Sequence, residues 1–249
     1  MLIDLHAHSS GISRCCRIPA EEVIERTLAA GLDGIVLCNH YVKNYVADDN
    51  YDEFAKRYID EFHRAKEYGD SVGCKVFFGV EVTMNKHDNA HILLYGIDEE
   101  FVLKNPRLCN LTQEELYRTV KEAGGTVILA HPYREEINHI NKNILDPKFL
   151  DGVEINCHPG QTNSYVSEMI EIAKAHGYII TCGGDYHADV PYRPRCGAYL
   201  PDTLCDGVAI GRYLHTTDSI KLHVHESYTK NEYDYIYTRS LGKSERIQP

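Results

Sequence analysis

The chain of 249 residues is predicted to fold as a single α/β domain, and three observations support this fold class. Short apolar runs alternate with helix-length segments from Leu2 to His187, which is the order expected of a parallel sheet with crossover helices. Histidines or carboxylates follow several of these apolar runs. No linker, repeat or low-complexity run divides the chain into separate units.

Seven apolar runs have the length and composition of buried strands. They lie at residues 2–6, 33–40, 75–83, 91–96, 126–132, 152–156 and 178–182. Helices are predicted at residues 19–31, 51–71, 112–125 and 166–176. Pro19 and the acidic residues after it suit a first helical turn, and Gly31 ends that helix. Thr112 and the residues after it resemble the start of another helix.

The alternation weakens beyond Gly211. Residues 221–225 are predicted as one extra strand, and the polar end from Gly242 is predicted as a mobile tail. His223 and His225 on that extra strand are expected to be surface or strand-packing residues.

Charge and cysteine usage limit the function classes. The net charge of −11, with His counted as neutral, argues against an extended surface for long nucleic acid or an anionic membrane. A small phosphorylated substrate remains compatible with it. No export signal or apolar run of membrane-spanning length is present in the sequence, so we expect a cytoplasmic protein whose nine cysteines are reduced thiols.

His6 and His8 are the first candidate metal ligands, because residues i and i+2 of a strand point to the same face. Other residues of ligand type also stand at the ends of predicted strands: His40, Glu81, His131, Asp185 and His187. In α/β barrels the functional residues lie at the carboxyl ends of the strands, so these side chains are expected to converge. Imidazoles and carboxylates suit clusters of zinc, manganese or iron. The rule that ligands stand at strand ends does not select His91, because this residue begins its predicted strand.

Five motifs match those of one family in order and spacing. They are Asp4-Leu5-His6-Ala7-His8-Ser9, Cys38-Asn39-His40, Gly79-Val80-Glu81, Ala130-His131-Pro132 and Gly184-Asp185-Tyr186-His187. Over residues 2–200 the chain resembles the PHP (polymerase and histidinol phosphatase) family. The resemblance implies a distorted (β/α)7 TIM-like barrel over residues 1–211, with residues 212–249 as a C-terminal extension that packs on it. It also implies two or three divalent transition-metal ions (Zn, Mn or Fe) and phosphoester hydrolysis.

The resemblance also implies how the ligands are shared. The first metal would take His6, His8, Glu81 and Asp185; Glu81 would bridge to a second metal held by His91 and His131; and a third would take His40 and His187. A further ligand of the third site is expected where Arg14 stands, and a guanidinium cannot ligate a metal. Three possibilities remain open. The third site is weak, or Cys16 or the substrate completes it, or Arg14 performs part of the role of the third metal.

The expected activity is that of a metal-dependent phosphoesterase, most simply a phosphomonoesterase on a small phosphorylated substrate, with a metal-bridging hydroxide as nucleophile. Arg14 and His187 are the candidate catalytic residues, and Arg14 and Arg17 are the candidate phosphate-binding residues. Glu154 and Asn156 are further candidates for lining the pocket or for supporting the ligands, and His158 is a candidate for lining the pocket. The alternatives are a phosphodiesterase or nuclease acting on nucleotides, an amidohydrolase, and a non-catalytic metal-binding regulatory domain.

Overall fold

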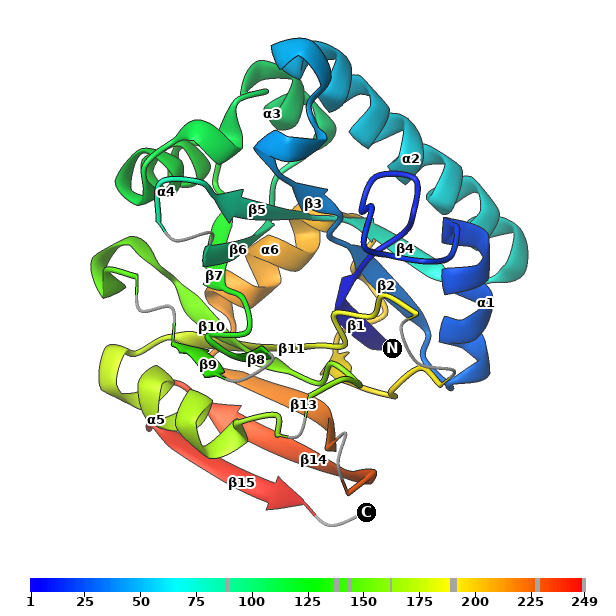
Figure 1. The fold of residues 1–249 in the computed structure, drawn as a ribbon. Coiled ribbons are helices and arrows are strands. Elements are labelled where there is room, and N and C mark those ends of the chain that lie inside the picture. Colours follow the sequence, from blue (N-terminus) through cyan, green and yellow to red (C-terminus); the bar gives the residue numbers. More distant parts are fainter. Residues whose placement is uncertain are drawn as a thin grey trace.

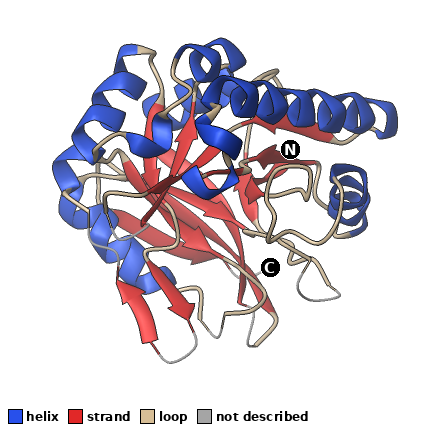
Figure 2. Cartoon of the chain, turned by 45° about the horizontal axis from the view of Figure 1, so that its top comes forward, coloured by secondary structure: helices blue, strands red, loops and turns tan. Residues whose placement is uncertain are grey.

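The computed structural model describes residues 1–87, 90–136, 139–142, 145–161, 163–188, 192–226 and 229–247, and these form a mixed α/β fold. Strands fill the centre of the molecule, and most helices lie outside them (Figures 1 and 2). The α/β prediction is therefore confirmed. The described strands form separate sheets and not one closed (β/α)7 barrel.

The first sheet has the strand order β15-β14-β13-β12-β1-β2-β4 in the described part of the chain. Its three parallel strands are β1 (Leu2–Ala7), β2 (Gly34–Leu37) and β4 (Lys75–Phe78). Its antiparallel strands are β12 (Gly197–Tyr199), β13 (Ser219–Glu226), β14 (Asn231–Thr238) and β15 (Lys243–Ile247). β15 lies in the segment that the sequence suggested as a mobile tail, and backbone pairing with β14 orders it.

The second sheet has the order β11-β10-β7-β6-β5-β3. Its strands are β3 (His40–Tyr41), β5 (Val80–Met84), β6 (Ala90–Tyr95), β7 (Thr126–Leu129), β10 (Gly152–Asn156) and β11 (Ile179–Gly183). Every described pairing is parallel except those of β6, which runs antiparallel to both β5 and β7. The expectation of a wholly parallel arrangement is therefore wrong at β6. This strand begins at Ala90, too soon after Met84 for the crossover that a parallel neighbour of β5 would need.

Helices and a small hairpin complete the fold. The helices are α1 (Ala20–Ala29), α2 (Tyr51–Val72), α3 (Glu99–Lys104), α4 (Gln113–Glu122), α5 (Val166–His176) and α6 (Gly207–Thr216). Thr112 caps α4 in a reciprocal capping box with Glu115, as its sequence suggested. Strands β8 (Tyr133–Glu136) and β9 (His139–Lys142) form a two-stranded sheet that the sequence did not predict. No described helix combines the length and the apolar character needed to span a membrane.

The two large sheets meet at two places. β2 leads into β3, and β4 leads into β5 through Gly79, where a Cβ would lie 2.6 Å from the sulfur of Cys38. At the other side, Asp185 N donates to His6 O at 2.8 Å, and Ala7 forms an isolated parallel bridge with Tyr186. The ends of β1 and β11 are thereby held side by side.

A buried ion pair reinforces this second junction. Asp4 Oδ1 accepts hydrogen bonds from His6 N at 2.9 Å and Gly184 N at 2.8 Å, and Arg193 Nη2 donates to Asp4 Oδ2 at 2.6 Å. The side chains of Asp4 and Arg193 are 0% and 1% exposed. A Cβ at Gly184 would lie 2.8 Å from Asp4 Oδ2, so the close approach requires glycine.

We expect Asp4→Ala to lower the free energy of unfolding by about 3–5 kcal/mol, because it leaves the Arg193 guanidinium buried without a counter-charge. Urea unfolding in the presence of a chelator measures this apart from any effect of metal. Asp202→Ala is the control: Asp202 also pairs with a cation, the N-terminal ammonium, but its side chain is 86% exposed, and it should change stability little. Equal stability of the two variants would contradict the assigned role of Asp4.

Candidate metal centre

The eight side chains predicted as metal ligands lie together. They come from the ends of β1, β7 and β11, from the starts of β3 and β5, which follow β2 and β4, and from the start of β6. Seven of them are buried and His91 is half-buried. The antiparallel direction of β6 explains how His91 joins the others. Thr83 near the end of β5 pairs with His91 near the start of β6, and Ala130 N donates to His91 O at 3.1 Å. The amino end of β6 therefore lies beside the carboxyl ends of its neighbours.

Glu81 stands between two groups of imidazoles. Its Oε1 lies 2.8 Å from His91 Nδ1, 3.1 Å from His131 Nε2 and 3.4 Å from His6 Nε2. Its Oε2 lies 2.5 Å from His40 Nδ1 and 3.4 Å from His8 Nε2. The two oxygens of one carboxylate thus face different sets of nitrogens, as a bridging ligand requires.

Asp185 lies close to two of the same imidazoles. Its Oδ1 lies 3.1 Å from His8 Nε2 and 3.6 Å from His6 Nε2. Asp185 has a φ of +44° and His131 a φ of +27°, in the left-handed region that residues other than glycine rarely adopt. Residues with strained backbone conformations are concentrated at functional sites, where the surrounding structure holds them in place.

Three histidines have one ring nitrogen held by a protein group. Nδ1 of His6 contacts Glu154 Oε1 at 2.8 Å, and Nδ1 of His8 contacts Ser13 Oγ at 3.0 Å. Nδ1 of His187 contacts the carbonyl oxygen of Asp185 at 2.8 Å. Such groups accept a hydrogen bond from Nδ1–H and thereby fix the tautomer of a metal-binding histidine. The Nε2 atoms are then free to act as ligands.

The remaining polar atoms fit a bound cation. His6 Nε2 and His8 Nε2 lie 3.0 Å apart, and His40 Nε2 and His187 Nε2 lie 3.3 Å apart. Glu81 Oε2, both carboxylate oxygens of Asp185 and His40 Nδ1 are buried without an aligned hydrogen-bond partner among the described residues. Buried polar atoms without partners are rare in native proteins. One carboxylate-rich set, His6, His8, Glu81 and Asp185, has donor atoms within 4.8 Å of one another, and so has the set His8, His40 and His187.

The electrostatics of the centre favour ionised carboxylates. Burial by itself raises the pKa of Glu81, but His40, His91 and His6 outweigh it and hold the pKa well below its usual value. Burial likewise raises the pKa of Asp185, and His6 and His187 lower it well below the ordinary range. Burial lowers the pKa of His131 to about 4, so this imidazole stays neutral and can act as a ligand.

The loop before α1 places a cysteine at the centre that sequence reasoning missed. The Cys15 thiol lies close enough to His40 and His187 to shift the pKa of both imidazoles, and the Tyr45 hydroxyl donates to its sulfur at 3.8 Å. Burial raises the pKa of this thiol, but its contacts with His187 and His40 lower it to about 5. Cys16 is buried with its sulfur 3.6 Å from the carbonyl oxygens of His8 and Ile18, away from this contact.

Arg14 and Arg17 are both exposed. The Arg14 guanidinium lies over the Tyr45 ring at 4.9 Å and donates to the carbonyl oxygens of Asn44 and Tyr45 at 3.3 and 3.4 Å. The backbone N of Arg17 donates to His187 O at 3.1 Å. Sequence spacing had assigned a ligand position to Arg14, whereas the path of the loop directs the next residue towards the imidazoles.

Another arginine reaches the centre from the segment after β7. Arg134 Nη1 lies 3.6 Å from Asp185 Oδ2. Arg134 lines a small cavity together with His131, Gln161 and Ser164. Gln161 Nε2 and Ser164 Oγ are buried and have no hydrogen-bond partner in the described part of the chain. The cavity therefore offers unpaired donors beside the candidate ligands.

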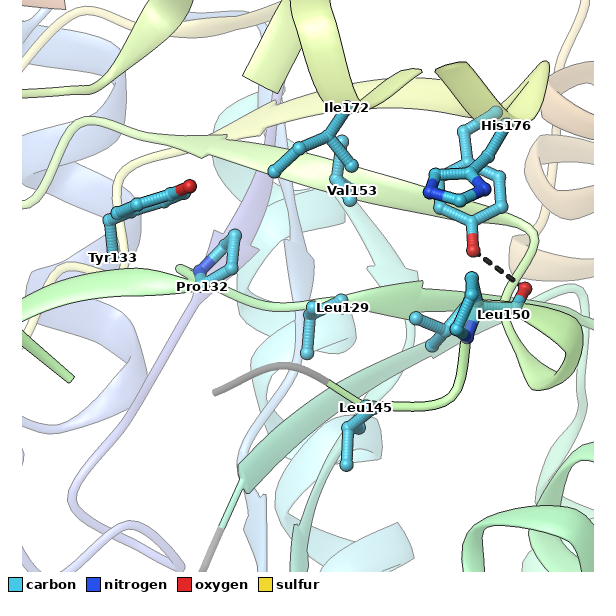
Figure 3. A pocket seen from close by; sticks show the side chains of 10 residues that line it. Leu129, Pro132, Tyr133, Leu145, Leu150, Val153, Ile172 and His176 are labelled. Atoms are coloured by element: carbon cyan, nitrogen blue, oxygen red, sulfur yellow. Dashed lines mark hydrogen bonds between the residues drawn. The ribbon is translucent and has the colours of Figure 1, made fainter. Parts of the chain in front are cut away.

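A separate apolar cavity of about 190 Å³ lies beyond Pro132. Figure 3 shows Tyr133 and Pro132 near one end of it and His176 near the other, with Leu129, Val153 and Ile172 between. No predicted metal ligand lines this cavity. His223 and His225 are buried on β13 and contact Asp234 and Glu232, so they pack within the sheet as expected.

The fold is similar to several solved structures. One is a two-domain protein from Bacteroides vulgatus that contains a predicted PHP-like metal-dependent phosphoesterase, at 14% identity and a TM-score of 0.56, covering 96% of this chain and 64% of that one. Another is an amidohydrolase from Chromobacterium violaceum, at 17% identity and a TM-score of 0.57, covering 86% and 96%. A third is a lesion-specific endonuclease from Pyrococcus furiosus, at 14% identity and a TM-score of 0.54, covering 86% and 55%.

The resemblance to PHP-like proteins is confirmed in the fold. No protein-family model matches the chain, and no curated protein matches its sequence. At identities of 14–17% the likeness to solved structures concerns the fold, and the three structures above bear names of different hydrolytic activities. The reaction must therefore be argued from the side chains of the centre.

We expect Glu154→Gln to weaken metal binding about 10- to 100-fold, the usual effect of removing a carboxylate that orients a ligating histidine. Glu154 Oε1 contacts His6 Nδ1, and its Oε2 accepts from His131 N and from the amide of Asn156, both at 3.1 Å. The side-chain amide of Gln has one acceptor oxygen in place of two, so its NH2 group would face one of these partners. Competition with a chelator measures the affinity, and the exposed Glu100→Gln serves as control. Unchanged affinity in Glu154→Gln would show that His6 needs no such support.

Proposed function

We propose that the chain is a metal-dependent phosphoesterase, most simply a phosphomonoesterase that hydrolyses a small phosphorylated substrate. The observation that carries the proposal is Glu81, whose two oxygens face separate sets of imidazoles in a buried centre. A carboxylate shared in this way suits two adjacent divalent cations. Ions bound there would polarise a phosphoryl oxygen and lower the pKa of a bound water.

We propose the ligand sets that the family resemblance implies. The contacts of Glu81 support them in part, because Oε1 faces His91 and His131 while Oε2 faces His8, although Oε1 also faces His6. Glu81 would be shared between a position held by His6, His8 and Asp185 and a position held by His91 and His131. His40 and His187 would hold a third position. We propose a distorted barrel-like arrangement of the two sheets, because the contacts between β1 and β11 and the passage of β4 into β5 bring all these residues to one end.

The chain's own cations and donors would bind the phosphoryl group. We propose Arg134 as the main contact, since its guanidinium lies beside Asp185 and can donate two hydrogen bonds in parallel. Gln161 Nε2 and Ser164 Oγ line the same cavity and would donate to other oxygens of the substrate. Arg14 and Arg17 remain proposed contacts for a substrate that extends over the loop before α1, and His187 remains a proposed catalytic residue as a ligand of the third position.

A phosphodiesterase or nuclease is the second candidate. The observation that favours it is the similarity of the fold to the lesion-specific endonuclease. The net charge of −11 opposes binding of a long polyanion, so a nucleotide would be the better substrate in this class. A screen of the metal-loaded protein against phosphomonoesters, dinucleotides and amides, scored separately, distinguishes these candidates. Binding of metal without hydrolysis of any class would favour a regulatory domain.

We expect Glu81→Gln and His131→Ala each to abolish hydrolysis and to reduce the metal content from at least two ions per chain. Neutral Gln removes the charge that two cations would share. Elemental analysis and phosphate release measure the two effects, and circular dichroism checks the fold. His63→Ala on α2 is the control, because its side chain is 59% exposed and far from the ligand positions in sequence. Activity of Glu81→Gln within a few-fold of the wild type would refute the shared position.

We expect Arg134→Ala to lower kcat/KM about 10- to 100-fold without loss of metal. A hydrogen bond to a charged group is worth about 1.5–3 kcal/mol, and ~1.4 kcal/mol corresponds to a factor of ten. Arg134→Lys should recover only part, since an ammonium lacks the bidentate fork. Arg14→Ala and Arg17→Ala are the matched comparisons. A larger loss of kcat/KM in Arg14→Ala than in Arg134→Ala would show that the main phosphate contact lies in the loop before α1 and not at Arg134.

A further inference from the structure

The loop between β1 and α1 is built to hold Cys15 in one place. Ser13 Oγ contacts His8 Nδ1 at 3.0 Å and accepts from His40 N at 3.0 Å, which anchors the loop before Cys15. After it, Cys16 N donates to Ser13 O at 2.9 Å and Arg17 N donates to His187 O at 3.1 Å. The backbone on both sides of Cys15 is thus tied to the histidines that its thiol contacts.

The third ligand position has the surroundings of an incomplete metal site. His8, His40 and His187 are buried and offer nitrogen atoms within 4.8 Å of one another, and His40 Nε2 lies 3.3 Å from His187 Nε2. The Cys15 thiol lies close enough to His40 and His187, two members of that set, to raise the pKa of both imidazoles. Arg14, the residue that spacing places at the ligand position, lies instead over the ring of Tyr45.

We propose that Cys15 is a thiolate ligand of the position held by His40 and His187, and that it makes this position selective for a soft ion such as Zn²⁺. The inference rests on the proposed metal centre and specifies one of its positions. Binding would convert the Cys15 thiol to a thiolate, form one sulfur–metal bond and release one proton to solvent. Sulfur and imidazole ligands together favour zinc over manganese or magnesium, which prefer oxygen ligands.

The experiment titrates the metal-free, full-length chain with Co²⁺ and records the near-ultraviolet absorbance, where a thiolate bound to cobalt gives a charge-transfer band. We expect the band in the wild type and in Cys205→Ser, whose thiol is exposed and lies elsewhere in the chain. Cys15→Ser should lose the band together with about one equivalent of bound Zn²⁺. Cys15→His should keep the zinc and lose the band, because it supplies an imidazole in place of the thiolate.

Alkylation gives a second readout, because Cys15 and Cys205 are the exposed cysteines of the described chain. Zn²⁺ should protect Cys15 from iodoacetamide, whereas Mn²⁺ should not, and Cys205 should react equally in all samples. A wild type that binds cobalt without the band, or a Cys15→Ser variant that keeps it, overturns the assignment of Cys15 alone. A wild type that binds no cobalt overturns the metal centre itself and the inference with it.

Discussion

Two buried carboxylates are the constraint on which the rest of the structure depends. Glu81 and Asp185 are both fully buried, and burying an ionised carboxylate is costly unless positive charge compensates it. Imidazoles surround both groups and hold their pKa values low. Oxygens without aligned partners remain even so, and a bound cation would satisfy them. The concentration of histidines in one place is therefore explained by the charge that they and the proposed ions must balance.

Keeping these groups at fixed distances requires a rigid framework beneath them. Asp4 joins the backbone of β1 to that of Gly184, and Arg193 neutralises Asp4 inside the protein. Glu154 and Ser13 hold the rings of His6 and His8. Asp4, Glu154 and Ser13 each contact a ligand candidate or its backbone, so residues that need not touch an ion help to set the geometry of the centre.

The fold alone does not select the reaction, since structures of similar fold are named as a phosphoesterase, an amidohydrolase and an endonuclease. The groups around the proposed ligands must therefore decide it. Here these are Arg134, the unpaired donors of Gln161 and Ser164, and a thiol in the loop before α1. They support a phosphoryl substrate and a centre whose positions differ in their preference for metals.

The sequence by itself determined most regular elements from Leu2 to His187, because hydrophobic runs and helix-start residues act locally. It also predicted the eight ligand candidates, since strand ends and motif spacing are visible along the chain, although His91 needed the family resemblance. Only the tertiary structure decided the direction of β6, the addition of β12, β14 and β15 beside the predicted strand β13, and the approach of Arg134 to Asp185. It also turned Arg14 outward and Cys15 towards the imidazoles. These features depend on backbone pairing and on the path of a loop between distant residues, which no local pattern encodes.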